Sequence, residues 1–475
     1  MEMAVMRIAE EGFYVGEFGD RRLKRTGAEL CSRMVEQESV CLRRLGRDRA
    51  TEVRFGRWLS HPQVTYQEIV REGSRKTAQL AAGRHVLAIQ DSSELNYQKH
   101  AGRSVGLGRV GNGKDVGLFV HPVLVLDATN LACLGLAHQH LWIREPAHGD
   151  YPKEPIEARE SYRWLAAAQA ARQCLAQAAM VTIIADRESD IYEEWDRIPD
   201  SKTHLLTRVC RDRKLADGQT LYAWLEAQPV QACYALDVAE RPAKAGYVKG
   251  SITQGKRSAH RAQMEIRHGV VEILRPRQCK DKTAKKRIRL YTVDVREQAS
   301  SVVEGEEPIH WQLLTTHDVR SVKDALQMVD WYCGRWQIEQ LFRTLKKQGL
   351  DIESSQVESG QSLMKLAGVA MQAAVRTLQL TQAREGNTDR PAADVFDKEE
   401  VQVLERLQPQ LEGRTDKQKN PYTKDGLAWA AWLIARLGGW KGYASEAKPG
   451  PITMLRGQQL FATMVQGWKL ANLCA

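Results

Sequence analysis

The sequence predicts an α/β protein in which a mixed sheet carries a strand-rich insertion and is flanked by a helical domain at each end. Three observations predict this class. Short apolar runs of strand length alternate with helical patterns from His85 onward. Residues from about 211 to 310 are strand-rich and basic, with no helical pattern between the runs. Helical periodicity dominates before residue 73 and returns after about residue 375.

Three helices are predicted around the first domain, residues 1–72. Asp20 can cap a helix RRLKRTGAELCSRMVEQ, a second helix follows Asp48, and a third starts at Thr65. Arginines on a small helical module can contact DNA, although charged amphipathic helices are common elsewhere. The segment is therefore a candidate DNA-binding domain. Its candidate contacts are Arg21, Arg22 and Arg25.

Residues 73–375 carry the pattern of a mixed sheet. HVLAIQD, from His85, is a short apolar run, and two longer apolar runs on either side of Asn130 predict an antiparallel pair. A helix and two further strands, MVTIIADRESD and HLLTRV, follow them. Three strands, helix, strand, helix, strand is also the element order of a ribonuclease-H-like core. A long helix is expected to start near Ser321.

Positive charge is concentrated in one segment. Between Arg241 and Leu290 there are fifteen Lys and Arg against three Asp and Glu, whereas the whole chain has a formal charge of +10. A basic segment on a nearly neutral body indicates a polyanionic partner. A solvated basic loop is the alternative.

Several other classes of protein are disfavoured. No stretch approaches the run of about 20 apolar residues that spans a bilayer, so no membrane partner is expected. The first residues lack the basic-then-apolar order of a signal peptide. The nine cysteines contain no Cys-x-x-Cys pair, which disfavours a disulfide framework and a structural zinc site. A cytoplasmic protein is the simplest expectation.

Two aspartates end apolar runs of strand length. Asp91 closes HVLAIQD, and Asp186 closes the run TIIAD. A carboxylate at the end of a buried strand lies at the edge of the sheet, where a site can form without disturbing the core. An aspartate in that position is more often a turn former or a helix cap.

A polar stripe is predicted on the long helix that starts near Ser321. Tyr332, Arg335, Glu339 and Lys346 fall within an arc of about 60° at about 100° per residue, beside the apolar face of the same helix. This set suits the binding of phosphate next to a metal ion. The alternative is a solvated stripe in which Arg335 and Glu339 form an i,i+4 pair worth a few tenths of a kcal/mol.

Tyr332-x2-Arg335-x3-Glu339-x6-Lys346 resembles the signature of the insertion-sequence-four family of bacterial transposases, with every spacing kept. AIQDSSELNY and IADRESD are similar to the motifs that hold the first and second catalytic aspartates of that family. GDRRLKR, RFGRWLSHP, HWQLLTT and LAWAAWLIARLGGW extend the resemblance over most of the chain, and it is greatest to the Tn-five type.

The resemblance implies a ribonuclease-H-like catalytic core with a β-rich insertion, and a C-terminal helical dimerisation domain, residues 376–475. It implies that Asp91, Asp186 and Glu339 are catalytic and hold two Mg²⁺, for which Mn²⁺ would substitute. The implied reaction is cut-and-paste transposition: DNA hydrolysis, a hairpin intermediate and strand transfer into target DNA. The implied setting is a homodimer on double-stranded DNA, in the bacterial cytoplasm with the nucleoid.

The same resemblance implies roles in holding DNA. Trp311 would stack on a flipped base, Arg208 would contact the backbone, and Tyr332, Arg335 and Lys346 would hold the adjacent phosphates. As a residue at the start of a strand, Trp311 could instead belong to the core.

Trp429, Trp432 and Leu433, on the most apolar late helix, form either a dimer interface or the core of their own domain. Two other functions stay open. One is a non-catalytic DNA-binding regulator of transposition, which has no need of three acids. The other is a simple metal-dependent nuclease of the same fold, which has no need of a base-flipping Trp311.

Overall fold

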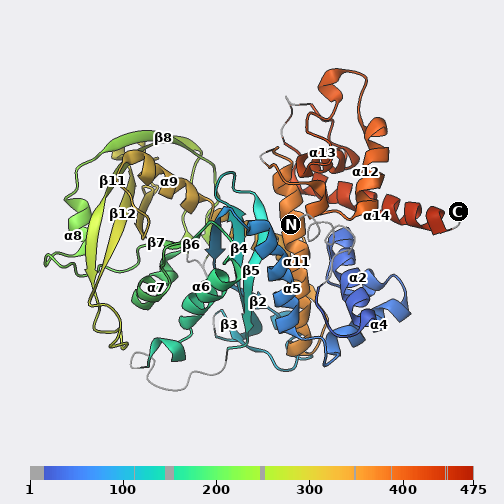
Figure 1. Ribbon diagram of the computed structural model, residues 1–475, viewed down its shortest axis with the longest axis horizontal. Coiled ribbons are helices and arrows are strands. Elements are labelled where there is room, and N and C mark those ends of the chain that lie inside the picture. The colour runs from blue at the N-terminus through green and yellow to red at the C-terminus, as the bar shows by residue number, and fades with distance from the viewer. Residues whose placement is uncertain are drawn as a thin grey trace.

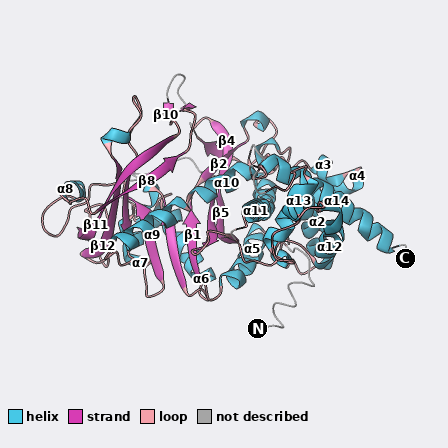
Figure 2. Cartoon of the chain, turned by 90° about the horizontal axis from the view of Figure 1, so that it is seen from above, coloured by secondary structure: helices cyan, strands magenta, loops and turns pink. Residues whose placement is uncertain are grey.

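The computed structural model describes residues 15–111, 113–144, 154–245, 252–346, 349–386, 388–443, 446 and 448–473. In these residues one mixed sheet of eleven strands fills one half of the molecule, and helices fill the other half (Figure 1). The view from above separates the same two halves (Figure 2). The protein is therefore mixed α/β, as the sequence predicts.

The middle of the sheet has the order β5-β4-β1-β6-β7. β1 runs antiparallel to β4 but parallel to β6, and β6 runs parallel to β7. Two short strands, β2 and β3, also pair with β4. The bounds are β1 (His85–Gln90), β2 (Ser93–Asn96), β3 (Gly108–Val110), β4 (Asp115–Asp127), β5 (Cys133–Trp142), β6 (Met180–Ala185) and β7 (Thr203–Arg208).

The strand-rich segment extends this same sheet. β13 (His310–Thr315) pairs antiparallel with β7, and the antiparallel strands β12 (Arg287–Glu297), β11 (His260–Leu274) and β8 (Ala232–Val238) follow outward. Two short strands, β9 (Lys244–Ala245) and β10 (Ile252–Gln254), form a separate pair. The segment also contains a short helix, α8 (Leu221–Glu226), where no helix was predicted. Its six residues are too few to show a helical period in the sequence.

Helices cover both faces of the sheet. Successive residues of a strand point to opposite faces, so alternate side chains of β1 enter different apolar cores. On β1, Val86 and Ala88 enter a core with residues of α6 (Tyr162–Cys174) and α7 (Tyr192–Arg197). Leu87 and Ile89 enter the core on the other face, which includes residues of α9 (Val322–Cys333), α10 (Trp336–Leu345) and α11 (Gly360–Ala383).

The N-terminal helices begin at the predicted caps. The side chains of Asp20, Asp48 and Thr65 accept hydrogen bonds from backbone N–H groups of the helices that follow them. The helices share one apolar core with the sheet and with α11. Their bounds are α2 (Arg21–Gln37), α3 (Leu42–Gly46), α4 (Arg49–Ser60) and α5 (Tyr66–Ala81).

The C-terminal helices form a separate apolar core with the end of α11. Trp429, Trp432 and Leu433 are at most 2% exposed, so within this chain they are core residues. The bounds are α12 (Lys398–Leu411), α13 (Leu427–Leu437) and α14 (Pro451–Leu473). No helix in the described parts of the chain is both long and apolar enough to cross a membrane.

Both expected domain boundaries fall inside helices. Residue 72 lies within α5, and residue 375 lies within α11. The reason is that each helix serves two regions, so no change of composition marks its end. α5 packs against β5 and α11, and its Ile69 lies in the same apolar core as residues of the N-terminal helices, while α11 contributes to two apolar cores.

Candidate active site

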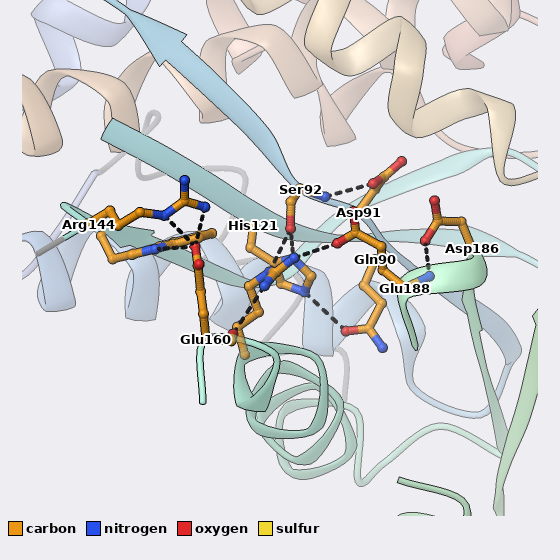
Figure 3. Close-up of polar contacts among 10 residues, drawn as sticks. Gln90, Asp91, Ser92, His121, Arg144, Glu160, Asp186 and Glu188 are labelled. Atoms are coloured by element: carbon orange, nitrogen blue, oxygen red, sulfur yellow. Dashed lines mark hydrogen bonds and ion pairs between the residues drawn. The ribbon is translucent and has the colours of Figure 1, made fainter. Parts of the chain in front are cut away.

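Sheet register places Asp91 and Asp186 side by side. Ile89 of β1 lies opposite Ile184 of the parallel strand β6, and each aspartate follows two residues later on its own strand. Both carboxylates therefore emerge at the same edge of the sheet, as Figure 3 shows. Asp186 also accepts a hydrogen bond from the N–H of Glu188 at 2.9 Å, which starts a short 3-10 turn.

The segment that carries Glu339 is two helices, where the sequence predicted one. α9 is capped by Ser321 as expected and ends at Gly334, and α10 starts after Arg335. Gly334 and Arg335 both keep right-handed helical torsions, so the helical period passes through the break. The predicted stripe is only partly preserved. Tyr332 is 5% exposed and packs into the core, whereas the Glu339 side chain is 37% exposed.

Arg335 joins the acids of the sheet edge to the acid of α10. Its Nη1 lies 3.0 Å from Oδ2 of Asp91, and its Nη2 lies 3.0 Å from Oε1 of Glu339. Burial and the nearby charge of Asp186 raise the pKa of Asp91 to about 7. The guanidinium lowers that pKa again, although not enough to offset the other two effects. Asp91 and Glu339 thus share the positive charge of Arg335, and Asp186 lies beside Asp91 at the end of the next strand.

These residues line one large cleft together with most of the predicted DNA contacts. Lys346, at the end of α10, has its Nζ 3.7 Å from Oε1 of Glu353. The rings of Trp311 and Tyr332 have centroids 6.1 Å apart at 59°, and Trp311 is half-buried and lines the cleft. Arg208 also lines the cleft, and its Nη2 donates to the carbonyl oxygen of His310 at 2.7 Å.

Arg21, Arg22 and Arg25 are exposed on α2 and do not line this cleft. The basic segment is divided between two places. Its residues Arg241 and Arg257 line the cleft, whereas its β11–β12 turn packs near α7, where the Tyr192 hydroxyl donates to the Lys285 carbonyl oxygen.

The donor chemistry of the site fits a divalent cation. Asp91 and Asp186 present carboxylate oxygens from adjacent strand ends, and a cation would offset their mutual repulsion. As they stand, no three His, Cys, Asp or Glu side chains in the described part of the chain are close enough together to hold a metal ion. Arg335 instead provides the positive charge between Asp91 and Glu339.

His138 and His140 lie on β5, and burial lowers the pKa of both, that of His138 to about 4.

Sequence reasoning missed a set of buried polar residues directly beneath the two aspartates. Gln90, His121 and Glu194 are each at most 1% exposed, and hydrogen bonds connect them. One signal was present in the sequence. His121 interrupts the apolar run FVHPVLVLDA, and a polar residue inside a buried strand needs a partner.

A comparison with protein families gives the class of protein that part of the chain resembles. Residues 166–373 match the family model described as Transposase DDE domain. The matched segment contains Asp186 and Glu339 and begins after Asp91. The match supports a DDE-type transposase.

Among solved structures, piggyBac transposase in a synaptic complex with hairpin DNA, determined by cryo-EM, is similar with a TM-score of 0.33 at 8% sequence identity. The similarity covers 82% of this chain and 54% of that one, so this chain matches about half of the length of the other.

Proposed function

We propose that this protein is a cut-and-paste DNA transposase of the insertion-sequence-four type, with Asp91, Asp186 and Glu339 as its catalytic carboxylates. One observation carries the proposal. Arg335 pairs with both Asp91 and Glu339, Asp186 follows the strand next to that of Asp91, and all three acids line one cleft with basic and aromatic side chains. The match of residues 166–373 to a transposase domain supports it. The strand order β5-β4-β1-β6-β7, with β4 antiparallel to β1, supports a ribonuclease-H-like core.

The carboxylates would hold two Mg²⁺, with Mn²⁺ as a substitute, because hard divalent cations prefer oxygen ligands. When bound, the cations would activate water for attack on phosphorus and neutralise the charge that develops there. Arg335 and Lys346 would bind the phosphates next to the cut, and Arg335 can do so with two parallel hydrogen bonds. Tyr332 would support Arg335 from the core.

Trp311 would stack on a base flipped out of the bent DNA end, since it lines the cleft. Arg208 would contact the DNA backbone, because its guanidinium lies at the cleft wall. The N-terminal helices would bind the transposon end through Arg21, Arg22 and Arg25. The C-terminal helices would join two subunits in the synaptic complex, which acts on DNA in the cytoplasm.

The test combines purified protein with Mg²⁺ and DNA that carries the terminal inverted repeats of the element. We expect hairpin-ended fragments first and strand-transfer products later, resolved on denaturing gels. Asp186→Ala serves as the matched control and should bind the same DNA in a gel shift without cutting it. Nicks without hairpins or strand transfer would identify a simple nuclease. Binding without any cutting by the wild-type protein would identify a regulator.

A further inference from the structure

A chain of buried hydrogen bonds runs through the residues on either side of Asp91. The Ser92 hydroxyl and Nδ1 of His121 are 2.8 Å apart, and Nε2 of His121 lies 3.2 Å from Oε1 of Gln90 (Figure 3). The amide nitrogen of Gln90 donates to Oε1 of Glu194 at 3.0 Å. His121 is fully buried, and burial lowers its pKa well below the usual range, so the ring is neutral. A neutral ring with its proton on Nε2 satisfies both contacts.

Arg163, on α6, connects this chain to the segment that carries Asp186. Its Nε donates to the Ser92 hydroxyl at 2.9 Å, and its Nη2 donates to Oε2 of Glu188 at 2.6 Å. A third bond, from Nη1 to the Glu160 carbonyl oxygen at 3.1 Å, fixes the guanidinium to the turn that precedes α6. The Arg163 side chain is 14% exposed. The planar guanidinium of Arg163 thus holds both Ser92, which follows Asp91, and Glu188, which lies two residues after Asp186.

A second connection joins the same two segments on the far side of Gln90. The Ser189 hydroxyl donates to Oε2 of Glu194 at 2.6 Å, while Oε1 of Glu194 accepts from Gln90. Ser189 and Glu194 are each 1% exposed. Gln90 and Ser92 flank Asp91, and Glu188 and Ser189 follow Asp186. The two strand ends are therefore tied together at two points, one through Arg163 and one through Glu194.

These two connections oppose the electrostatic repulsion between the carboxylates of Asp91 and Asp186. Asp91 and Asp186 repel each other at the edge of the sheet, and both lie at the ends of strands, where backbone pairing stops. The links among Gln90, His121, Glu194 and Ser189 are buried, so breaking one leaves a buried polar group without its partner. The Arg163–Glu188 pair is more exposed, with the Glu188 side chain 64% exposed, but the Arg163 side of this pair is only 14% exposed. Side chains that hold metal-binding residues in place typically change metal affinity by about 10- to 100-fold when they are removed.

We propose that Arg163 is a positioning residue that sets the spacing of the Asp91 and Asp186 carboxylates for a divalent cation. The inference rests on the proposed function, since that function makes the two aspartates cation ligands. Arg163 does not touch either carboxylate itself. It acts through Ser92 and Glu188, so its effect depends on its fork of donors as well as on its charge.

The experiment measures Mn²⁺ affinity of the full-length protein without DNA, by isothermal titration. Arg163→Gln should bind Mn²⁺ about 10-fold or more weakly, and Arg163→Lys, which keeps the charge but loses the fork, should recover only part of the affinity. Arg144→Gln is the matched control. Arg144 pairs with Glu160 at 2.7 Å, beside the network but without contact to Ser92 or Glu188, and its loss should leave the affinity unchanged. A folded Arg163→Gln protein with wild-type affinity overturns the proposal.

Two further variants keep the test decisive if Arg163→Gln does not fold. Ser92→Ala and Glu188→Gln each remove one partner of Arg163, and each should weaken Mn²⁺ binding, whereas wild-type affinity in both overturns the proposal. Asp186→Asn separates this inference from the function on which it rests. If Asp186→Asn binds Mn²⁺ normally, the metal assignment itself fails. If Asp186→Asn binds weakly while the Arg163 variants bind normally, only the positioning role fails.

Discussion

The two ends of the central strands are built on opposite principles. At the carboxyl ends of β1 and β6, Asp91 and Asp186 face each other with like charges. At the opposite end, β1 starts with His85, β7 carries His204 as its second residue, and His317 follows β13. The neighbouring strands β1, β6, β7 and β13 therefore place an acidic pair at one end of the sheet and three imidazoles at the other.

The histidine end is internally satisfied. The Thr182 hydroxyl lies 2.8 Å from Nε2 of His85 and 2.8 Å from Nε2 of His317. The rings of His204 and His317 stack with centroids 4.0 Å apart. Burial, followed by the neighbouring imidazoles, lowers the pKa of His317 to about 3, so the ring is neutral at physiological pH. These groups need nothing from outside the chain.

The acidic end has no such balance, because Asp91 and Glu339 share the charge of Arg335 and the charge of Asp186 acts on Asp91 as well. An end that is satisfied contributes stability, and an end that is not satisfied is free to bind. Residues with shifted pKa values at the two ends of one strand can thus serve either stability or ligand binding. Three measurements test this contrast, in order of decreasing effect.

Asp91→Asn should reduce DNA cleavage roughly a thousandfold or more, the scale expected when one member of a catalytic unit is lost. The thermal midpoint should change by only a few degrees, because Asn keeps the shape of the side chain and removes a like charge beside Asp186. Single-turnover cleavage and calorimetry measure the two effects. A large loss of stability with little loss of cleavage would reverse the roles of the two ends.

His317→Ala should do the opposite. The substitution removes a buried ring, its hydrogen bond to Thr182 and its stack on His204, which costs about 2–4 kcal/mol of unfolding free energy. Cleavage per folded molecule should stay within about twofold of wild type, because His317 lies at the far end of the strands. Urea denaturation and single-turnover cleavage at a temperature where both proteins are folded provide the measurements. A catalytic defect in folded His317→Ala would show that the histidine end also contributes to catalysis, which contradicts the proposed contrast.

The smallest effect is in the pH dependence of stability. His317 has a folded pKa of about 3 and an unfolded pKa near 6.5, so its stabilising effect is complete above pH ~6.5 and is lost as pH falls toward 3. Burial also lowers the pKa values of His85 and His204, so their contributions change in the same direction. Between pH 6 and 5, unfolding free energy should fall more steeply in wild type than in His317→Gln, by about 1 kcal/mol per pH unit. Equal slopes would show that His317 does not titrate in this window.

Much of the fold follows from local chemistry that is legible in the sequence. Asp20 caps the helix it was expected to cap, and helices start after Asp48, Thr65 and Ser321 where helix starts were expected, each of these residues serving as the cap. Capping is predictable because it needs only one side chain and the next turn of backbone. The paired runs around Asn130 form β4 and β5 as expected. The domain boundaries stay predictions, and the residues chosen for them, 72 and 375, lie within α5 and α11.

The candidate site was only partly predictable. The spacing from Tyr332 to Lys346 suggested a phosphate-binding stripe, but a periodicity of 100° per residue does not reveal the break at Gly334 or the burial of Tyr332. The proximity of Asp91 and Asp186 depends on the parallel register of β1 and β6, which no local pattern encodes. The contacts of Arg163 could not be predicted from the sequence for the same reason. Its partners are 71 and 25 residues away in the chain.

α11 limits where the chain can be divided. Its 24 residues extend about 36 Å as one rod, with Leu363 to Leu378 in the core beside the sheet and Leu380 and Ala383 in the core of the C-terminal helices. A shortened protein that ends at residue 375 would lose the last two turns of this rod and leave Val375 at a frayed end. A chain cut after Ala383 keeps the rod intact but exposes the apolar surface that α13 covers. The C-terminal helices therefore depend on α11, which they share with the rest of the protein. A fragment designed to study these helices alone must include α11.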